Sequence, residues 1–128
     1  MISGLDVSGA VNAIYAADGG GTLNVDRSRL RVLPTTGQAG VAVAGSTVNL
    51  SNSVIRTPGG FPAYVTVNSS ANSTLNMDGV TIHDTNPAAT SALTSQVLPS
   101  QSGTAMLRFE NSIASGTEFG YDRDALLM

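Results

Sequence analysis

The chain has 128 residues, a net charge of −3, no cysteine and no tryptophan. The lack of cysteine excludes disulfides and thiolate metal sites. Because its 6 basic residues are all arginine and are outnumbered by 9 acids, we expect no nucleic-acid partner. The length suits one domain, and 14 glycines among many other small residues favour a core of thin stacked layers.

The N-terminal segment, residues 1–21, is predicted to form only the later part of one structural repeat. Residues 10–16 (AVNAIYA) are predicted to form a strand, followed by a glycine-rich turn at 18–21. The segment has neither a positively charged start nor a sustained apolar run, so it does not resemble a secretory signal. The longest apolar run of the chain is far below the ~18 residues needed to cross a bilayer. We therefore expect a soluble product, made in the cytoplasm and not inserted in a membrane.

One sequence pattern recurs through the rest of the chain. Residues 21–32 read GTLNVDRSRLRV, residues 46–57 read STVNLSNSVIRT and residues 73–84 read STLNMDGVTIHD. A weaker fourth copy, TAMLRFENSIAS, covers residues 104–115. Such internal repetition is typical of proteins built from stacked structural repeats.

Alternation within each copy divides the side chains of its first strand into two sets. The inward set is predicted to be Leu23 and Val25, Val48 and Leu50, Leu75 and Met77, and Leu107 and Phe109. A corner residue follows in each copy: Arg27, Asn52, Gly79 and Asn111. Asparagine and glycine tolerate left-handed backbone angles, so three of these four suit a sharp corner. A second strand then carries Leu30, Ile55 and Ile82 inward, with Ala114 as a poor fit in the fourth copy.

A third short strand is predicted before each new copy, at residues 40–44, 63–68 and 92–97. Segments of uneven length that each contain proline (33–39, 58–62 and 85–91) separate the second strand from the third. If the copies stack, these segments emerge along one edge, where recognition is expected. Three short strands per repeat predict one rung of a parallel β-solenoid. An antiparallel sandwich is the structural rival, although it would not require matched residue types in successive copies.

The copies, with their [ST]-T-[LV]-N-[LM] strands followed by Asn-Ser or Asp-Gly corners, resemble right-handed parallel β-helices. They are similar to autotransporter passengers of the pertactin type and to the short β-helical modules of phage tailspikes, fibres and capsid decoration proteins. The resemblance implies an all-β chain: a short right-handed parallel β-helix of about four rungs over residues 1–114, and a non-repeating C-terminal tail over residues 115–128. The missing export signal and membrane barrel indicate a virion component or a fragment, not a complete autotransporter.

Stacking would place equivalent outward residues in columns, with neighbours ~4.8 Å apart. Asn24, Asn49 and Asn76 form one column, in which the amides can bond to one another along the stack. A second column contains Arg31, Arg56 and His83, with Ser115 next. It is either a narrow cationic stripe for an acidic glycan or for an acidic patch on a partner protein, or ordinary solvated charge balanced by acids such as Asp84.

A third column contains Asp26, Ser51, Asp78 and Glu110. Asp78 and Glu110 would be close enough to act as paired carboxylates in glycoside cleavage, or to hold a calcium ion. Four rungs leave little room for a cleft, however, so we expect solvent-facing acids, no catalytic residue, no metal and no cofactor. His83, the only histidine, is expected to be a surface residue and not a catalytic base.

Phe61 and Tyr64 lie in and beside one of the proline-containing segments, and alternation with Val65 and Val67 turns Tyr64 outward. Aromatic side chains there can stack on a sugar or insert into a neighbouring subunit. The alternative is that they cover their own rung.

Residues 116–128 (GTEFGYDRDALLM) break the pattern. Asp122 could cap a short helical turn. The ends of a solenoid expose backbone and apolar core, so something has to cover them. The tail is expected either to fold under the last rung or to dock on another chain, through Phe119, Tyr121, Leu126, Leu127 and Met128.

These features predict a non-enzymatic structural protein that forms a homo-oligomer, most simply a cyclic trimer. It would sit on a larger protein assembly, such as the capsid of a virion, as a cement or decoration protein. One alternative is a glycan- or surface-binding segment of an adhesin or tail fibre, located at the cell surface. The other alternative is a carbohydrate-cleaving β-helix enzyme.

Overall fold

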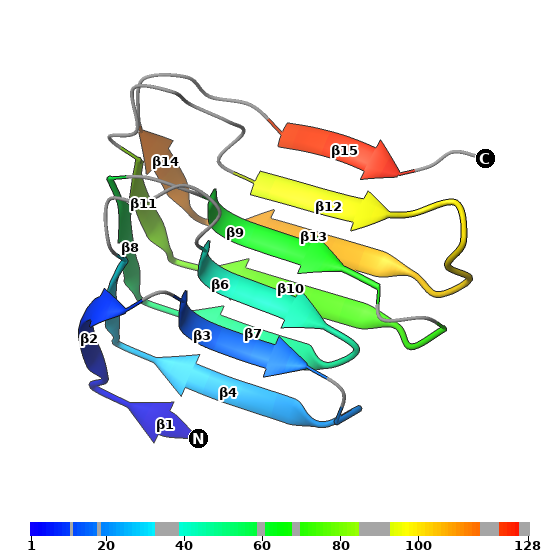
Figure 1. Cartoon of the computed structure of the whole chain (residues 1–128). Coiled ribbons are helices and arrows are strands. Elements are labelled where there is room, and N and C mark those ends of the chain that lie inside the picture. The colour runs from blue at the N-terminus through cyan, green and yellow to red at the C-terminus, as the bar shows by residue number, and fades with distance from the viewer. Residues whose placement is uncertain are drawn as a thin grey trace.

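The computed structural model describes residues 1–10, 12–17, 19–32, 39–58, 61–67, 70–84, 93–115 and 121–125, except for the side chains of Ala10, Asp84, Thr94, Ser115 and residues 121–125. All regular secondary structure in this part of the chain is β-strand (Figure 1). No helix among these residues is long and apolar enough to span a membrane.

The strands form three five-stranded sheets in which every pairing is parallel. Sheet A contains β1 (Ile2–Ser3), β4 (Thr22–Asp26), β7 (Thr47–Ser51), β10 (Ser73–Asp78) and β13 (Ala105–Glu110). Sheet B contains β2 (Asp6–Ala10), β5 (Arg29–Val32), β8 (Val54–Thr57), β11 (Thr81–Asp84) and β14 (Ile113–Ser115). Sheet C contains β3 (Asn12–Ala17), β6 (Ala39–Ala44), β9 (Phe61–Thr66), β12 (Leu93–Val97) and β15 (Tyr121–Ala125).

The chain passes through sheets A, B and C in that order, and we call one such passage a turn. Each strand therefore pairs with the strand three positions later in the chain. In Figure 1, sheet C lies in front of sheet A, sheet B closes one side, and β1 and β15 lie at opposite ends of the stack. Each sheet has one strand more than the four sequence copies suggest, because β1, β2 and β3 supply a turn ahead of the first copy.

The core lies between the three sheets and includes the predicted inward side chains together with residues of sheet C such as Val41, Val43 and Val65. Leu23, Val48, Leu75 and Leu107 are aligned in register across sheet A, and Leu30 and Ile55 align with Ile82 in sheet B. The central members Val48, Leu75, Ile55 and Ile82 are completely buried. Leu107, Phe109 and Ala114 are only partly buried, because they belong to the last turn.

The corner between sheets A and B requires a left-handed backbone at one position in each copy. The φ angles of Arg27, Asn52, Gly79 and Asn111 are 49°, 48°, 65° and 48°. The residue types predict this backbone for the two asparagines and the glycine, and Arg27 adopts it as well. The serine that follows three of these corners binds the turn before it. The hydroxyls of Ser28, Ser53 and Ser112 accept hydrogen bonds from the backbone N–H groups of Leu5, Ser28 and Val80, at 3.2, 3.0 and 2.8 Å.

The third strands are also in place. The predicted strands at 40–44, 63–68 and 92–97 correspond to β6, β9 and β12, and the predicted strand at 10–16 corresponds to β3. The expectation for the tail was wrong in one respect. Asp122 does not begin a helical turn, because it lies in β15, which pairs in parallel with β12 and continues sheet C.

Candidate functional site

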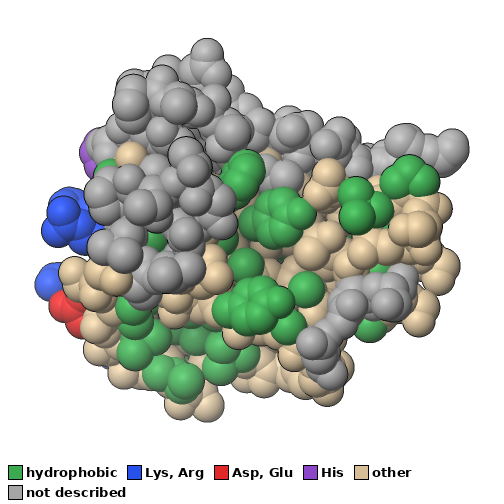
Figure 2. All heavy atoms as spheres, in the orientation of Figure 1, with side chains coloured by type: hydrophobic (Ala, Val, Ile, Leu, Met, Phe, Trp, Pro, Cys, Tyr) green, Lys and Arg blue, Asp and Glu red, His purple; other side chains and the backbone are tan. Residues whose placement is uncertain are grey.

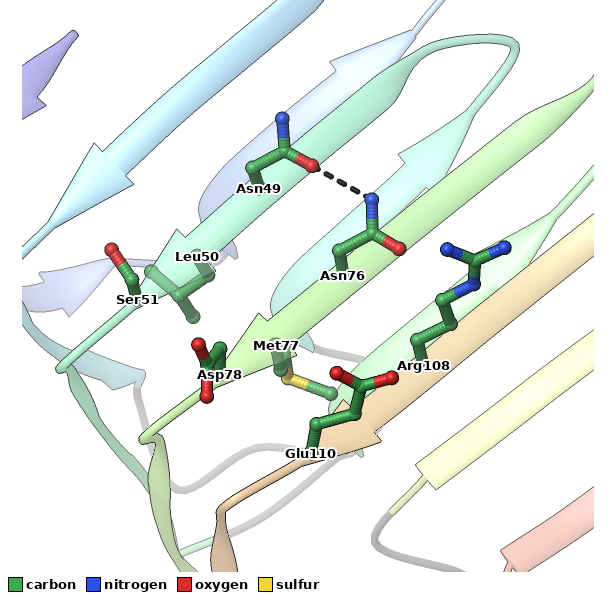
Figure 3. Close-up of a pocket in the computed structure, with 8 residues that line it drawn as sticks. All are labelled: Asn49, Leu50, Ser51, Asn76, Met77, Asp78, Arg108 and Glu110. Carbon is green, nitrogen blue, oxygen red and sulfur yellow. Dashed lines mark hydrogen bonds between the residues drawn. The ribbon is translucent and has the colours of Figure 1, made fainter.

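The outer face of sheet A has a shallow hollow of about 250 Å³ next to its corner with sheet B (Figure 3). It spans β7, β10 and β13, so it crosses three successive turns. Leu50 and Met77 face the core beneath it. Its polar lining consists of outward-facing side chains: Asn49, Ser51, Asn76, Asp78, Arg108 and Glu110.

A ladder of asparagine amides leads into this hollow. The Nδ2 of Asn49 donates to the Oδ1 of Asn24, and the Nδ2 of Asn76 donates to the Oδ1 of Asn49, both at 2.7 Å. The predicted structural use of this column is therefore confirmed. The Oδ1 of Asn76 is buried without a hydrogen-bond partner, and the next residue in register is Arg108 in place of a fourth asparagine.

The predicted acidic column is also formed, but its members have different surroundings. Asp26, Ser51, Asp78 and Glu110 are aligned in register. Asp26 accepts hydrogen bonds from Asn52 Nδ2 at 2.9 Å and from Ser51 Oγ at 2.8 Å, and it forms an ion pair with Arg27 Nε at 2.7 Å. These contacts, the Asn52 and Ser51 hydrogen bonds above all, lower the pKa of Asp26 below its usual value.

Asp78 and Glu110 line the hollow at the ends of β10 and β13, directly opposite each other on neighbouring strands. Asp78 accepts a hydrogen bond from Asn111 Nδ2 at 2.9 Å, and Glu110 is exposed. Nowhere in the described part of the chain do three His, Cys, Asp or Glu side chains converge in a way that could hold a metal ion. The lining can bind hydroxyl or amine donors through its carboxylate and amide oxygens, and an acceptor through Arg108.

The predicted basic column lies on the outer face of sheet B. Arg31, Arg56 and His83 are aligned in register, with Ser115 next to His83, and all three are exposed. They are separate from the hollow, because the corner between the two sheets lies between them.

The aromatic residues lie on sheet C. The Phe61 and Tyr64 ring centroids are 5.7 Å apart with the rings tilted, and the Tyr64 hydroxyl donates to Gln96 Oε1 at 2.7 Å. Both side chains are half-buried. Residues 61 and 64 thus partly cover their own turn, which was the alternative that the sequence left open.

The sequence did not single out a third aromatic residue on this face. Tyr15 is 65% exposed and lies in register with Ala42, which in turn lies in register with Tyr64. Ala42 is only 7% exposed although its two neighbours in β6, Val41 and Val43, face the core. Alternation at residues 10–16 was ambiguous, because small alanines surround Tyr15, so the face that it occupies could not be assigned.

The remaining predicted docking residues have a different status. Tyr121 begins β15, where its backbone pairs with Leu93, and its side chain lies outside the described residues. Phe119, Leu126, Leu127 and Met128 lie outside them entirely. Comparison of the chain with protein-family models, with curated proteins and with solved structures finds no match.

Proposed function

We propose that the chain is a short right-handed parallel β-helix that works as a non-enzymatic structural protein in an oligomeric assembly. Parallel strands of one sheet that are joined through the other two sheets are crossover connections, and nearly all such connections are right-handed. The same residue types recur at matched positions in successive turns, as a layered scaffold requires. Such a regular layered scaffold supports a structural role in an assembly better than a catalytic role.

The observation that carries this proposal is that the outermost strands of the three sheets pair on one side only within the described part of the chain. β1, β2 and β3 form one edge of the three sheets, and β13, β14 and β15 form the other. An edge strand presents a row of backbone donors and acceptors to any neighbouring chain. Large apolar side chains are exposed on these same strands: Ile2 (45%), Met106 (39%) and Ile113 (67%).

An assembly that covers these strands would stabilise the chain by mass action, because a partner that binds only the folded form shifts the folding equilibrium. A homo-oligomer, most simply a cyclic trimer, meets this need. A larger protein surface such as a phage capsid also meets it, which is the role of a cement or decoration protein in a virion. The sequence resemblance to β-helical virion modules is what favours the capsid as the larger partner.

Sedimentation over a range of concentrations tests the oligomer. We expect the native chain to associate, and Ile113→Glu to weaken association by at least about tenfold, since it places a charge on an edge strand. Thr81→Glu is the matched control: it changes the neighbouring position of the same outward column, on the interior strand β11. A native chain that stays a folded monomer at every concentration would contradict the proposal. If the native chain does associate, electron microscopy of the assembly isolated from its source would identify the larger partner.

A second candidate function, glycan binding, rests on the aromatic side chains of sheet C. Tyr15 and Tyr64 lie two strands apart on one face of sheet C, with the Phe61 ring against Tyr64. Figure 2 shows apolar side chains gathered on this face, over β3, β6 and β9. Rigid aromatic rings with a polar tip are suited to stack on sugar rings. Binding on a glycan array that is lost on Tyr15→Ala and on Tyr64→Ala would support this function, and no binding by the native chain would rule it out.

A further inference from the structure

Two arginines lie side by side on the outer face of sheet B. Arg31 of β5 is directly opposite Arg56 of β8, so their backbones are separated by one strand spacing, about 4.8 Å. Both side chains are exposed. Figure 2 shows basic side chains at the left edge of the molecule, with the histidine above them and an acidic side chain below them. Like charges placed directly opposite each other destabilise a sheet.

No described carboxylate offsets this repulsion. Among the described residues, the ion pair that forms is the one between Arg27 and Asp26, at the corner before β5. The segments that follow β5, β8 and β11 (residues 33–38, 58–60 and 85–92) contain no Asp or Glu. Arg29, which precedes Arg31 on the same face, differs because it lies opposite Asp6. Arg31 and Arg56 are therefore the two described arginines of this face that lie directly opposite each other.

We propose that Arg31 and Arg56 form a binding site for a tetrahedral oxyanion, a phosphate or sulfate group. A guanidinium presents several N–H donors in a planar fork that matches the oxygens of such a group. Two arginines whose backbones are separated by one strand spacing can both donate to the oxygens of one anion, and these charge-assisted hydrogen bonds are stronger than neutral ones. A bound anion would also offset the repulsion between the two arginines, because both positive charges would be attracted to it.

The surroundings of the pair fit a small anionic group. Ser8 continues the column on one side and His83 on the other, so a hydroxyl and an imidazole flank the two guanidinium groups. The basic column is one residue wide in a chain of net charge −3, which is too narrow to follow the two strands of a nucleic-acid duplex. A free anion and an ester on a polymer share this chemistry, and the experiment has to distinguish them.

Binding is measured at low ionic strength by calorimetry with three probes: inorganic phosphate, inorganic sulfate and dextran sulfate, with uncharged dextran as the blank. We expect Arg31→Gln and Arg56→Gln each to weaken binding at least about tenfold, as the loss of a charge-assisted contact implies. Arg29→Gln, which removes the same charge from the same strand, should weaken it less than about threefold. Similar affinity for the free anions and for the polymer's sulfate groups would assign a free anion, and binding of dextran sulfate alone would assign an ester.

Thermal unfolding gives a second, independent readout. Without added anion at low salt, Arg56→Gln should melt at a higher temperature than the native chain, because the like-charge contact is gone. Phosphate should then raise the melting temperature of the native chain and leave that of the variant almost unchanged. An equal loss of binding in Arg29→Gln, or no binding of any probe by the native chain, would overturn the proposal. Sedimentation of each variant reports the oligomer separately, so a failure of the anion site is not confused with a failure of assembly.

Discussion

Asp26 is held by three neighbours from two turns of the chain. Ser51 and Asn52 reach it from the turn after its own, and Arg27 is its neighbour in sequence. All three stabilise the ionised carboxylate, so the pKa of Asp26 in the folded chain lies below its usual value, with the Asn52 hydrogen bond as the largest cause. A lowered folded pKa means that this carboxylate contributes stability above its unfolded pKa, and that the contribution is lost as the pH falls through the folded pKa.

We therefore expect the free energy of unfolding of the native chain to exceed that of Asp26→Asn at neutral pH. The difference should shrink as the pH falls below the usual range of an aspartate, and it should vanish once the native carboxyl is protonated in both states. Urea unfolding of the two proteins at a series of pH values measures this. Asp6→Asn serves as the control, because it removes the same charge from an exposed side chain. A difference that is constant with pH would show that Asp26 acts only through packing.

The columns of residues could be read from the sequence because each depends on one-residue alternation and on matched positions in the repeat. The asparagine ladder and the corner residues are confirmed at this level. The surroundings of each member could not be read in the same way. Asp26 and Asp78 occupy equivalent positions, yet Ser51 and Asn52 surround the first, whereas Asn111 alone donates a hydrogen bond to the second among the described contacts. These differences depend on side chains that reach across from the next turn.

At the scale of single elements, β6 approaches its neighbours more closely than an ordinary side chain allows. A Cβ built on Gly40 would lie 2.5 Å from Ile55 Cγ2 and 2.6 Å from the carbonyl oxygen of Pro62. Ile55 is a fully buried core residue of β8, and Pro62 belongs to the paired strand β9. Because the second contact is with backbone, it cannot be relieved by a change of rotamer. The glycine therefore sets how closely β6 lies against both strands.

Gly40→Ala is expected to lower the free energy of unfolding by about 1–3 kcal/mol, the usual range for an overpacked core. Gly21→Ala is the matched control, since a Cβ at Gly21 meets no atom within 4 Å and Gly21 precedes β4 on the surface. We expect that change to have an effect of less than about 0.5 kcal/mol, as for ordinary surface substitutions. Chemical denaturation of both variants measures the difference. Equal effects would show that β6 and β9 can move apart without cost.

Strands with clear alternation could be predicted to within about two residues, as β6 and β9 illustrate. The first two strands and the last were missed for different reasons. β1 has 2 residues, which is too short to show a period, and β2 contains glycine and alanine where a strand would normally carry larger side chains. β15 reads YDRDA, with charges at three successive positions, so its sequence suggests a polar tail. Its pairing with β12 provides what the local pattern lacks.

At the scale of the whole molecule, the site was harder to predict than the fold. Register follows from the repeat, but the hollow on sheet A exists because side chains of different lengths, such as Ser51, Asn76 and Arg108, stand next to one another in three turns. The repeat itself predicts a uniform face. The aromatic face of sheet C also combines residues from outside the repeated segments, Tyr15 and Tyr64. The candidate sites therefore lie where residues differ from the repeat.

Stacked strands imply that stability varies along the stack, because each turn contacts only its neighbours. Leu75 and Leu107 test this directly, since they are the same residue type in the same column on adjacent strands. Leu75 in β10 is fully buried with a paired strand on each side, whereas Leu107 in β13 is partly buried and lies on the edge of sheet A. Truncation to alanine removes the same atoms at both positions, so the difference reports the position in the stack.

We expect Leu75→Ala to cost about 2–5 kcal/mol of unfolding free energy, and Leu107→Ala roughly half as much or less. Amide hydrogen exchange should show the same order: slow exchange for β7 and β10, and faster exchange for β13 and β14, which open by local unfolding. The measurement has to be made at a concentration where the chain is monomeric, because a partner on the outer strands would protect them. If instead the partner is present, the protection of β13 should rise while that of β10 changes little. This would connect the stability of the last turn to the assembly that we propose covers it.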